Sequence, residues 1–156
     1  MRNRSSTDQD FNLWVLLNQV NDTIYKARQK ELKPYSISSR KAAVLFIIQA
    51  IGNKATPAKI GRWLLRESQS ISELLTRMEN EGLVRRTNDL GRRNLVRITL
   101  TEKGRQVYYQ STERKSFHRI LSSLSKEQHR QLRLCLKILR EKALEELGIE
   151  YRALFP

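Results

Sequence analysis

The sequence predicts a mainly helical protein with one small β-hairpin, and three observations support this fold class. Apolar residues recur at helical spacing through most of the chain. Residues 83–87 and 95–100 are instead rich in β-branched and apolar residues, and turn formers with two adjacent arginines separate them at 88–93. An amphipathic helix, about 70–81, directly precedes this hairpin. A helix followed by a cationic hairpin is typical of a winged helix-turn-helix.

Composition and charge indicate a globular protein with a polyanionic partner. The 156 residues are 39% hydrophobic and 29% charged, and 30 basic against 16 acidic residues give a net charge of +14. Residues 52–105 are the most basic part, with 12 basic and 6 acidic residues. Such an excess favours nucleic acid. The alternatives are a merely soluble basic surface, or an anionic membrane face, for which no helix pairs a lysine-rich side with a strongly apolar one.

The chain carries no sign of export or of membrane insertion. Its apolar runs fall well short of the roughly 20 residues that cross a bilayer, and its first ten residues, MRNRSSTDQD, lack the apolar stretch of a secretory signal. A single Cys135 excludes an internal disulfide framework. We therefore expect a cytoplasmic protein with no membrane contact.

The first two helices have clear boundaries. Residues 10–32 repeat apolar residues in steps of four and three, a coiled-coil-like seam, and Pro34 ends this helix. Ser38 or Ser39 can cap the second helix, which Gly52 closes. Its run Ala42-Ala43-Val44-Leu45-Phe46-Ile47-Ile48 is apolar nearly all round, so we expect it at the centre of the core.

The next pair of helices forms the helix-turn-helix. Thr56-Pro57 opens the first of them, with threonine as cap and proline at the first turn. The loop 66–69 leads into the helix 70–81, and Gly82 is placed to end it. The turn between the two helices lacks the glycine that often occurs there.

Two long helices are expected after the hairpin, at 102–123 and 126–147. Thr101 caps the first, and Ser125-Lys126-Glu127-Gln128 approximates a capping box for the second. The helices 10–32, 102–123 and 126–147 carry more apolar surface than a compact winged helix needs. We expect a second copy of the chain to bury this surface. A twofold dimer also suits DNA binding, because it sets two recognition helices about one duplex turn apart. The alternative is that these helices fold back on their own domain.

The order of these elements resembles the MarR (multiple-antibiotic-resistance-regulator) family of bacterial and archaeal transcription factors, over nearly the whole chain. Residues 70–84 resemble the family's recognition helix and its exit. The most specific motif resembles the family's wing signature and reads Asp89…Arg92-Arg93…Val96…Leu100-Thr101-Glu102-Lys103-Gly104. The resemblance implies one domain over 1–156, in which 38–104 form the DNA-binding lobe and 10–32 and 105–156 the dimerisation helices.

Side-chain chemistry assigns roles to the DNA-binding candidates. Near the start of the recognition helix, Gln69 can pair with adenine and Glu73 can accept from the cytosine amino group. Arg92 or Arg93 would enter the minor groove, where a narrow A/T-rich stretch concentrates negative potential. The other candidates bind bases or phosphates at the recognition helix, or flanking phosphates beside it, and are Ser70, Ser72, Thr76, Arg77, Thr56, Lys59, Arg85 and Arg86.

The function expected from these features is that of a sequence-specific regulator of transcription that binds double-stranded DNA. It would be a homodimeric repressor on a pseudo-palindromic operator, released by a small ligand or signal. The alternatives are a non-specific DNA-architectural or RNA-binding module, and a protein-interaction domain. The resemblance also implies a cleft for small aromatic acids, and the candidates for lining it, or for the core, are Trp14, Tyr25, Tyr35, Arg40 and Trp63.

Other reactive residue types form no catalytic or metal-binding pattern. Cys135 lies on the apolar stripe of the last helix, so we expect a buried core thiol. His118 and His129 have no neighbouring Cys or tight acidic cluster. No Ser/His/Asp arrangement or phosphate-binding glycine loop occurs. We therefore expect no enzyme activity, no cofactor and no metal.

Overall fold

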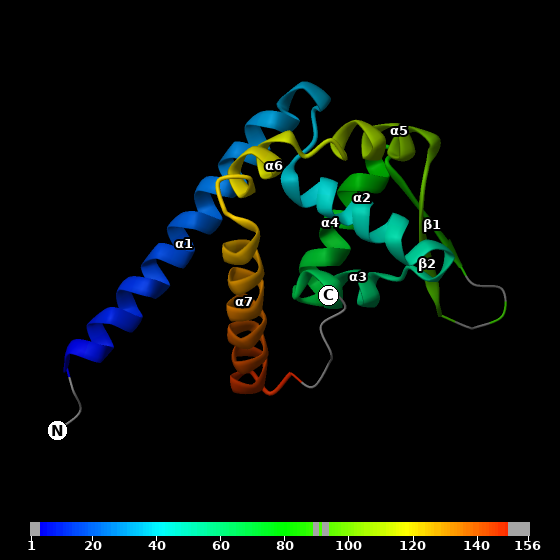
Figure 1. The fold of residues 1–156 in the computed structure, drawn as a ribbon. Coiled ribbons are helices and arrows are strands. Elements are labelled where there is room, and N and C mark those ends of the chain that lie inside the picture. Colours follow the sequence, from blue (N-terminus) through cyan, green and yellow to red (C-terminus); the bar gives the residue numbers. More distant parts are fainter. Residues whose placement is uncertain (1–3, 89–90, 92–93, 150–156) are drawn as a thin grey trace.

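The computed structural model of the chain describes residues 4–88, 91 and 94–149, which form seven α-helices and one two-stranded antiparallel sheet (Figure 1). The predicted fold class, mainly helical with a hairpin wing, is confirmed. In chain order the elements are α1 (Arg4–Leu32), α2 (Ser39–Ile51), α3 (Pro57–Leu64), α4 (Ser68–Asn80), β1 (Val84–Asn88), β2 (Val96–Leu100), α5 (Glu102–Ser111), α6 (Lys115–Leu121) and α7 (Lys126–Glu146). Short 3-10 turns, η1 (Lys33–Tyr35) and η2 (Gly52–Lys54), follow α1 and α2.

Local sequence signals place most of these boundaries. The side chains of Ser38, Thr56 and Thr101 each accept a backbone N–H three residues on, and Ser125 forms a complete capping box with Gln128. Gly82 ends α4 with a φ of 71°, in the left-handed region that glycine tolerates. The predicted caps are therefore confirmed.

The core of the lobe, which we define as residues 38–104, is built on α2. Its fully buried side chains come from several elements and include Leu45 of α2, Leu75 and Met78 of α4 and Ile98 of β2. The burial of Leu45 agrees with the central position predicted for the apolar run of α2. β1 and β2 pair from Val84↔Leu100 to Asn88↔Val96. The N–H of Ile98 donates to the carbonyl of Ala55 at 3.0 Å, which ties the wing to the link between α2 and α3.

Three expected boundaries are wrong. α1 begins at Arg4 rather than at residue 10, and α4 begins at Ser68, so the stretch 68–69 that we expected in a loop forms its first turn. The helix expected over 102–123 is broken into α5 and α6, with Arg114 between them at a φ of 47°. The partner that breaks it, Glu31, lies more than 80 residues away in the sequence, so no local pattern reveals it.

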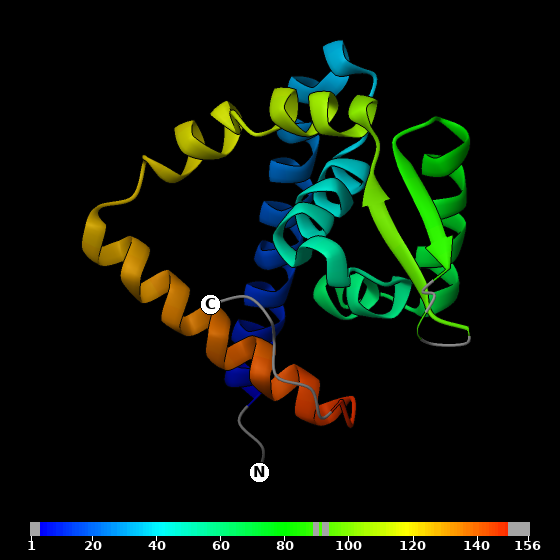
Figure 2. The same ribbon diagram turned by 90° about the vertical axis from the view of Figure 1, so that its right-hand side faces the viewer.

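The remaining helices, α1, α6 and α7, which we call the arms, have large apolar side chains on their surface. Figure 2 shows α5 and α6 leading away from the lobe and α7 turning back as a separate rod. α1 contacts α6, but along α7 only Leu144 among the apolar residues is buried. Exposed apolar residues of the arms include Phe11, Leu13, Trp14, Leu16, Val20, Leu132, Leu134, Leu136, Ile138 and Leu139.

Cys135 is exposed, so the prediction of a buried core thiol is wrong for the single chain. The reason is that the stripe of α7 that carries Cys135 does not pack on the lobe. No helix in the described part of the chain has the length and apolar character that spanning a bilayer requires.

Candidate nucleic-acid interface

The turn between α3 and α4, the two helices of the helix-turn-helix, contains no glycine. Leu65 adopts the left-handed conformation instead, with a φ of 51°, and Arg66 N–H donates to the carbonyl of Gly61 at 2.9 Å. A glycine in α3 eases the turn, because a Cβ on Gly61 would come within 3.1 Å of the carbonyl oxygen of Arg66, a tight contact. A larger residue than Gly61 would push against this turn and against Ile71 of α4.

α4 has one buried face and a broad exposed polar face. Ile71, Leu75 and Met78 pack into the core. The six candidates on this helix are all exposed, as residues that contact DNA must be, and they are Gln69, Ser70, Ser72, Glu73, Thr76 and Arg77. A helix that presents a row of short polar side chains has the shape and donors that major-groove contacts need.

The flanking candidates differ in their surroundings. Arg85 is exposed on β1 and Lys59 is half-buried in α3. Thr56 is buried, and its hydroxyl accepts the N–H of Lys59 as the cap of α3. Arg86 donates to atoms of α4 and is only partly exposed. Arg92 and Arg93, the expected wing-tip residues, lie outside the described residues.

The base of the wing explains the Leu-Thr-x-x-Gly motif in physical terms. Thr101 donates its hydroxyl to the carbonyl of Gly82 and accepts the N–H of Gly104 at 2.9 Å. A Cβ on Gly104 would lie 1.9 Å from the carbonyl oxygen of Leu83, so no larger residue fits there. The motif therefore fixes the start of α5 against the end of α4, which sets the position of the wing beside the recognition helix.

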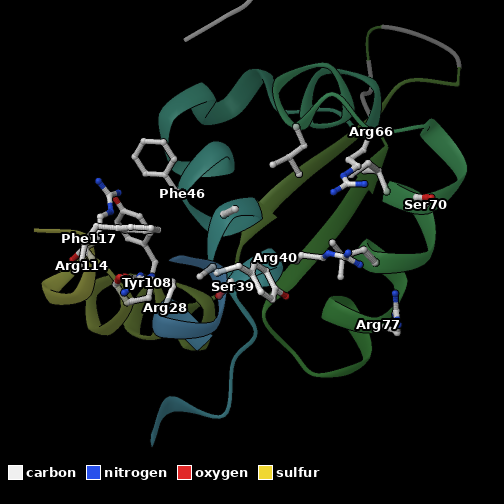
Figure 3. A pocket seen from close by; sticks show the side chains of 18 of the residues that line it. Arg28, Ser39, Arg40, Phe46, Arg66, Ser70, Arg77, Tyr108, Arg114 and Phe117 are labelled. Carbon is white, nitrogen blue, oxygen red and sulfur yellow. Dashed lines mark hydrogen bonds between the residues drawn. The ribbon is translucent and has the colours of Figure 1, made fainter. Parts of the chain in front are cut away.

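A cleft of about 750 Å³ lies between the lobe and the arms. Figure 3 shows Arg28, Tyr108, Arg114 and Phe117 grouped at one end, with Arg66, Ser70 and Arg77 at the other. Tyr25 and Arg40 line it, as the sequence analysis allowed. Its described lining does not include the other three candidates, Trp14, Tyr35 and Trp63.

The described lining of the cleft combines aromatic rings with positive charge. Five arginines line it, with Glu73 as the one acidic residue among them. The Arg114 guanidinium lies 4.7 Å from the ring centroid of Phe46, and that of Arg28 lies 5.6 Å from Phe117. Sequence patterns identified neither Arg28 nor Phe117, because their neighbours are distant along the chain.

A buried polar cluster joins α1 to the break between α5 and α6. The Arg28 guanidinium pairs with the Glu31 carboxylate at 3.0 Å and donates to the carbonyl of Ser111. Glu31 also accepts the N–H of Lys115 at 2.7 Å and both the N–H and the hydroxyl of Ser116. The carboxylate thus caps the N-terminus of α6 in place of a local residue.

Electrostatics of this cluster favour the charged carboxylate. Burial raises the pKa of Glu31, but hydrogen bonds from the Ser116 hydroxyl, the Arg28 guanidinium and the backbone N–H groups of Ser116 and Lys115 outweigh it. Together they lower the pKa from 4.5 to about 2. The cluster therefore remains ionised at neutral pH and holds α1 against the break between α5 and α6.

A helix-turn-helix with an exposed polar second helix, a two-stranded wing and a basic surface defines a winged helix DNA-binding protein. Residues 37–104 match the family described as "Winged helix DNA-binding domain". The whole chain belongs to the MarR family of transcriptional regulators, and is thus a DNA-binding regulator of transcription rather than an enzyme.

Similarity to solved structures supports this membership. The ligand-free organohalide-sensing regulator RdhR-CbdbA1625 is 31% identical over 95% of this chain and 89% of its own, with a TM-score of 0.85. Its form with bound 2,4-dichlorophenol is 33% identical over 87% and 82% of the two chains, with a TM-score of 0.80. A cysteine-to-serine mutant of E. coli MarR in complex with operator DNA shares the fold, at 20% identity, a TM-score of 0.78 and coverage of 85% and 96%. A comparison with curated protein sequences found no significant match.

Proposed function

We propose that the protein is a homodimeric repressor that binds a pseudo-palindromic operator and is released by a small aromatic effector. The observation that carries this proposal is the exposed polar face of α4 beside the wing, in a chain whose arms present apolar surface suited to a second copy. The E. coli relative crystallised with operator DNA uses the same fold.

The dimer is supported by the exposure of the arms. Phe11 and Trp14 of α1 are 61% and 58% exposed, and Ile138 of α7 is 60% exposed. Contiguous apolar surface of this kind marks an interaction site in a water-soluble protein. A twofold axis through the arms would place the two α4 helices for successive major grooves of one duplex.

The roles on DNA follow from the position of each side chain. Gln69 and Glu73, on the outermost side of α4, are the proposed base readers, with Ser70 and Ser72 beside them. Arg77 and Arg85 are proposed to contact phosphates. Arg92 and Arg93 are proposed to reach the minor groove, because they fall in the sequence between the two strands of the wing, β1 and β2.

The cleft is the proposed effector site. Phe46, Tyr108 and Phe117 offer ring surface, and the arginines around them favour an anionic or acidic aromatic compound. The relative RdhR-CbdbA1625 binds 2,4-dichlorophenol. A ligand here touches α4 on one side and the joint between α5 and α6 on the other, so it contacts both the lobe and the arms.

Selection from genomic duplex fragments tests the central proposal. The purified protein is expected to be a dimer and to enrich one palindromic sequence, and salicylate, as an aromatic-acid probe, should release it. Replacing Arg92 and Arg93 by alanine should weaken binding to all sequences alike and reduce its salt dependence. A featureless selected pool would instead support the non-specific architectural module.

A further inference from the structure

We propose that Arg86 is a positioning residue for the recognition helix rather than a contact to phosphate. It fixes α4 against strand β1, so that the base-reading side chains hold one orientation relative to the wing. This inference rests on the proposed reading of an operator by α4. It assigns Arg86 a role that its charge and its place beside the wing do not suggest from the sequence.

Within the described part of the chain, the hydrogen bonds and the ion pair of the Arg86 side chain reach α4. Its Nη2 donates to the carbonyl of Ser72 at 3.0 Å and to the hydroxyl of Thr76, also at 3.0 Å. Its Nη1 lies 3.5 Å from the carboxylate of Glu79, and its backbone N–H donates to that same carboxylate at 3.0 Å. One residue of β1 is therefore bonded to three residues spread over two turns of α4.

Strand geometry explains why Arg86 points inward and its neighbour does not. Successive side chains in a strand alternate between the two faces of the sheet. Val84 is buried, Arg85 is exposed, and Arg86 returns to the face that packs on α4, opposite the buried Ile98. The side chain of Arg86 is 30% exposed, because α4 covers the rest of it.

Both donors of Nη2, one of the two terminal nitrogens of Arg86, are committed within the chain. The nitrogen Nη2 carries two hydrogens, and the carbonyl of Ser72 and the hydroxyl of Thr76 account for both. Thr76 in turn donates its hydroxyl to the same carbonyl of Ser72, at 2.9 Å. A phosphate contact by Nη2 would require one of these bonds to break. The two terminal nitrogens of Arg86 thus reach different groups of α4, Nη2 the pair Ser72 and Thr76 and Nη1 the carboxylate of Glu79, and several charge-assisted contacts set geometry more strictly than a single surface ion pair.

The contacts of Arg86 lie at a place on α4 where they can influence how the helix reads bases. Ser72, Thr76 and Glu79 are spaced four and three residues apart, so they form one edge of the exposed face. Gln69 and Glu73 lie beside that edge on the outermost side of the helix. A rotation of α4 about its axis would move these proposed base readers relative to the groove, and the bonds from Arg86 oppose that rotation.

Two signatures separate a positioning residue from a phosphate contact. Loss of a phosphate contact lowers the slope of log affinity against log salt by about 0.9 and weakens binding to every duplex alike. Loss of a positioning residue leaves that slope unchanged but reduces the ratio of operator to non-specific affinity. A well-made base contact is worth about 1–3 kcal/mol of discrimination, so we expect this ratio to fall on the order of tenfold or more.

The experiment measures operator and random-duplex affinities of the full-length protein across a series of salt concentrations. Arg86→Ala is expected to lose discrimination with the wild-type salt slope. Arg86→Lys keeps the charge, but its single nitrogen cannot take the places of both Nη1 and Nη2, so it should lose discrimination as well. Glu79→Gln tests the other end of the interaction without removing a positive charge, and should also reduce discrimination. Thermal unfolding of each variant checks that it folds, and the lysine and glutamine variants decide the test if the alanine variant does not.

Arg85→Ala is the matched control, because it removes the same charge from the adjacent residue without touching α4. It should retain discrimination. An Arg86→Ala protein with a lower salt slope and full discrimination, a fully discriminating Arg86→Lys protein, or equal loss in Arg85→Ala would each overturn the inference alone. A wild-type protein that binds operator and random duplex equally would overturn the proposed function together with it.

Discussion

The lobe and the arms use apolar residues in opposite ways. In the lobe, α2, α4 and the wing bury Leu45, Leu75 and Ile98 completely within one chain. In the arms, α1 and α7 have comparable apolar periodicity but leave residues such as Trp14 and Leu139 about half exposed. The difference shows that the lobe closes its own core, whereas the arms leave apolar surface exposed in the single chain, as the proposed dimer requires. Four predictions test this contrast, in order of decreasing expected effect.

A core truncation in the lobe should be strongly destabilising. Leu75→Ala removes a fully buried side chain and leaves a cavity, so the free energy of unfolding should fall by about 2–5 kcal/mol. Denaturant unfolding measures this loss. The matched variant in the arms, Leu139→Ala, should cost an isolated chain no more than about 0.5 kcal/mol. Equal losses at low protein concentration would contradict the contrast between the two regions.

The contact between α1 and the break between α5 and α6 should depend on pH. The pKa of Glu31 lies at about 2 in the fold and at 4.5 ordinarily, so its ionised form stabilises the fold above pH 4.5 and this stabilisation is lost as the pH falls toward 2. Glu31→Gln should therefore lower stability at neutral pH by roughly 3 kcal/mol at most. The difference in stability between wild type and variant should disappear as the pH falls from 4.5 toward 2. Thermal unfolding at a series of pH values measures this difference. A gap that is independent of pH would show that the carboxylate charge is not responsible.

The apolar face of α7 should control assembly more than folding. The double substitution Leu136→Ser and Leu139→Ser should shift the protein from dimer to monomer in analytical ultracentrifugation, while the helical signal of the lobe is retained. Operator affinity should fall with it, because one recognition helix alone binds a half-site. A variant that remains fully dimeric would place the interface elsewhere.

The smallest effect is expected at Cys135. Its thiol is exposed in the single chain, so a thiol reagent should label it readily in dilute protein. If a second copy covers α7, labelling should slow as the protein concentration rises. The serine pair on α7 described above should abolish that concentration dependence. A rate that is independent of concentration in the wild type would contradict burial of α7 in the dimer.

Much of the lobe could be predicted because its signals are local. Thr56 and Thr101 cap helices through bonds to residues three positions away, and Gly82 ends α4 by its own conformational freedom. The exposed polar face of α4 could likewise be read from the spacing of its apolar residues. These effects act within one or two helical turns, so the order of residues is enough to reveal them.

Long-range contacts determined what the sequence did not. The helix expected over 102–123 has no local breaker, yet Glu31 divides it by binding the N–H groups of Lys115 and Ser116. The lining of the cleft was only partly foreseen for the same reason, since Arg28 and Phe117 meet only after folding.

The sequence by itself determined the class of fold, the caps, the recognition helix and the basic wing, because periodicity, capping and charge are properties of neighbouring residues. The tertiary structure decided which cations are committed and which are exposed. Arg85 and Arg86 are adjacent in the chain and identical in chemistry, but only Arg86 is bonded to α4. The physical reason is that a hydrogen bond depends on where its acceptor lies in space, and the acceptors of Arg86 come from a different element of the fold.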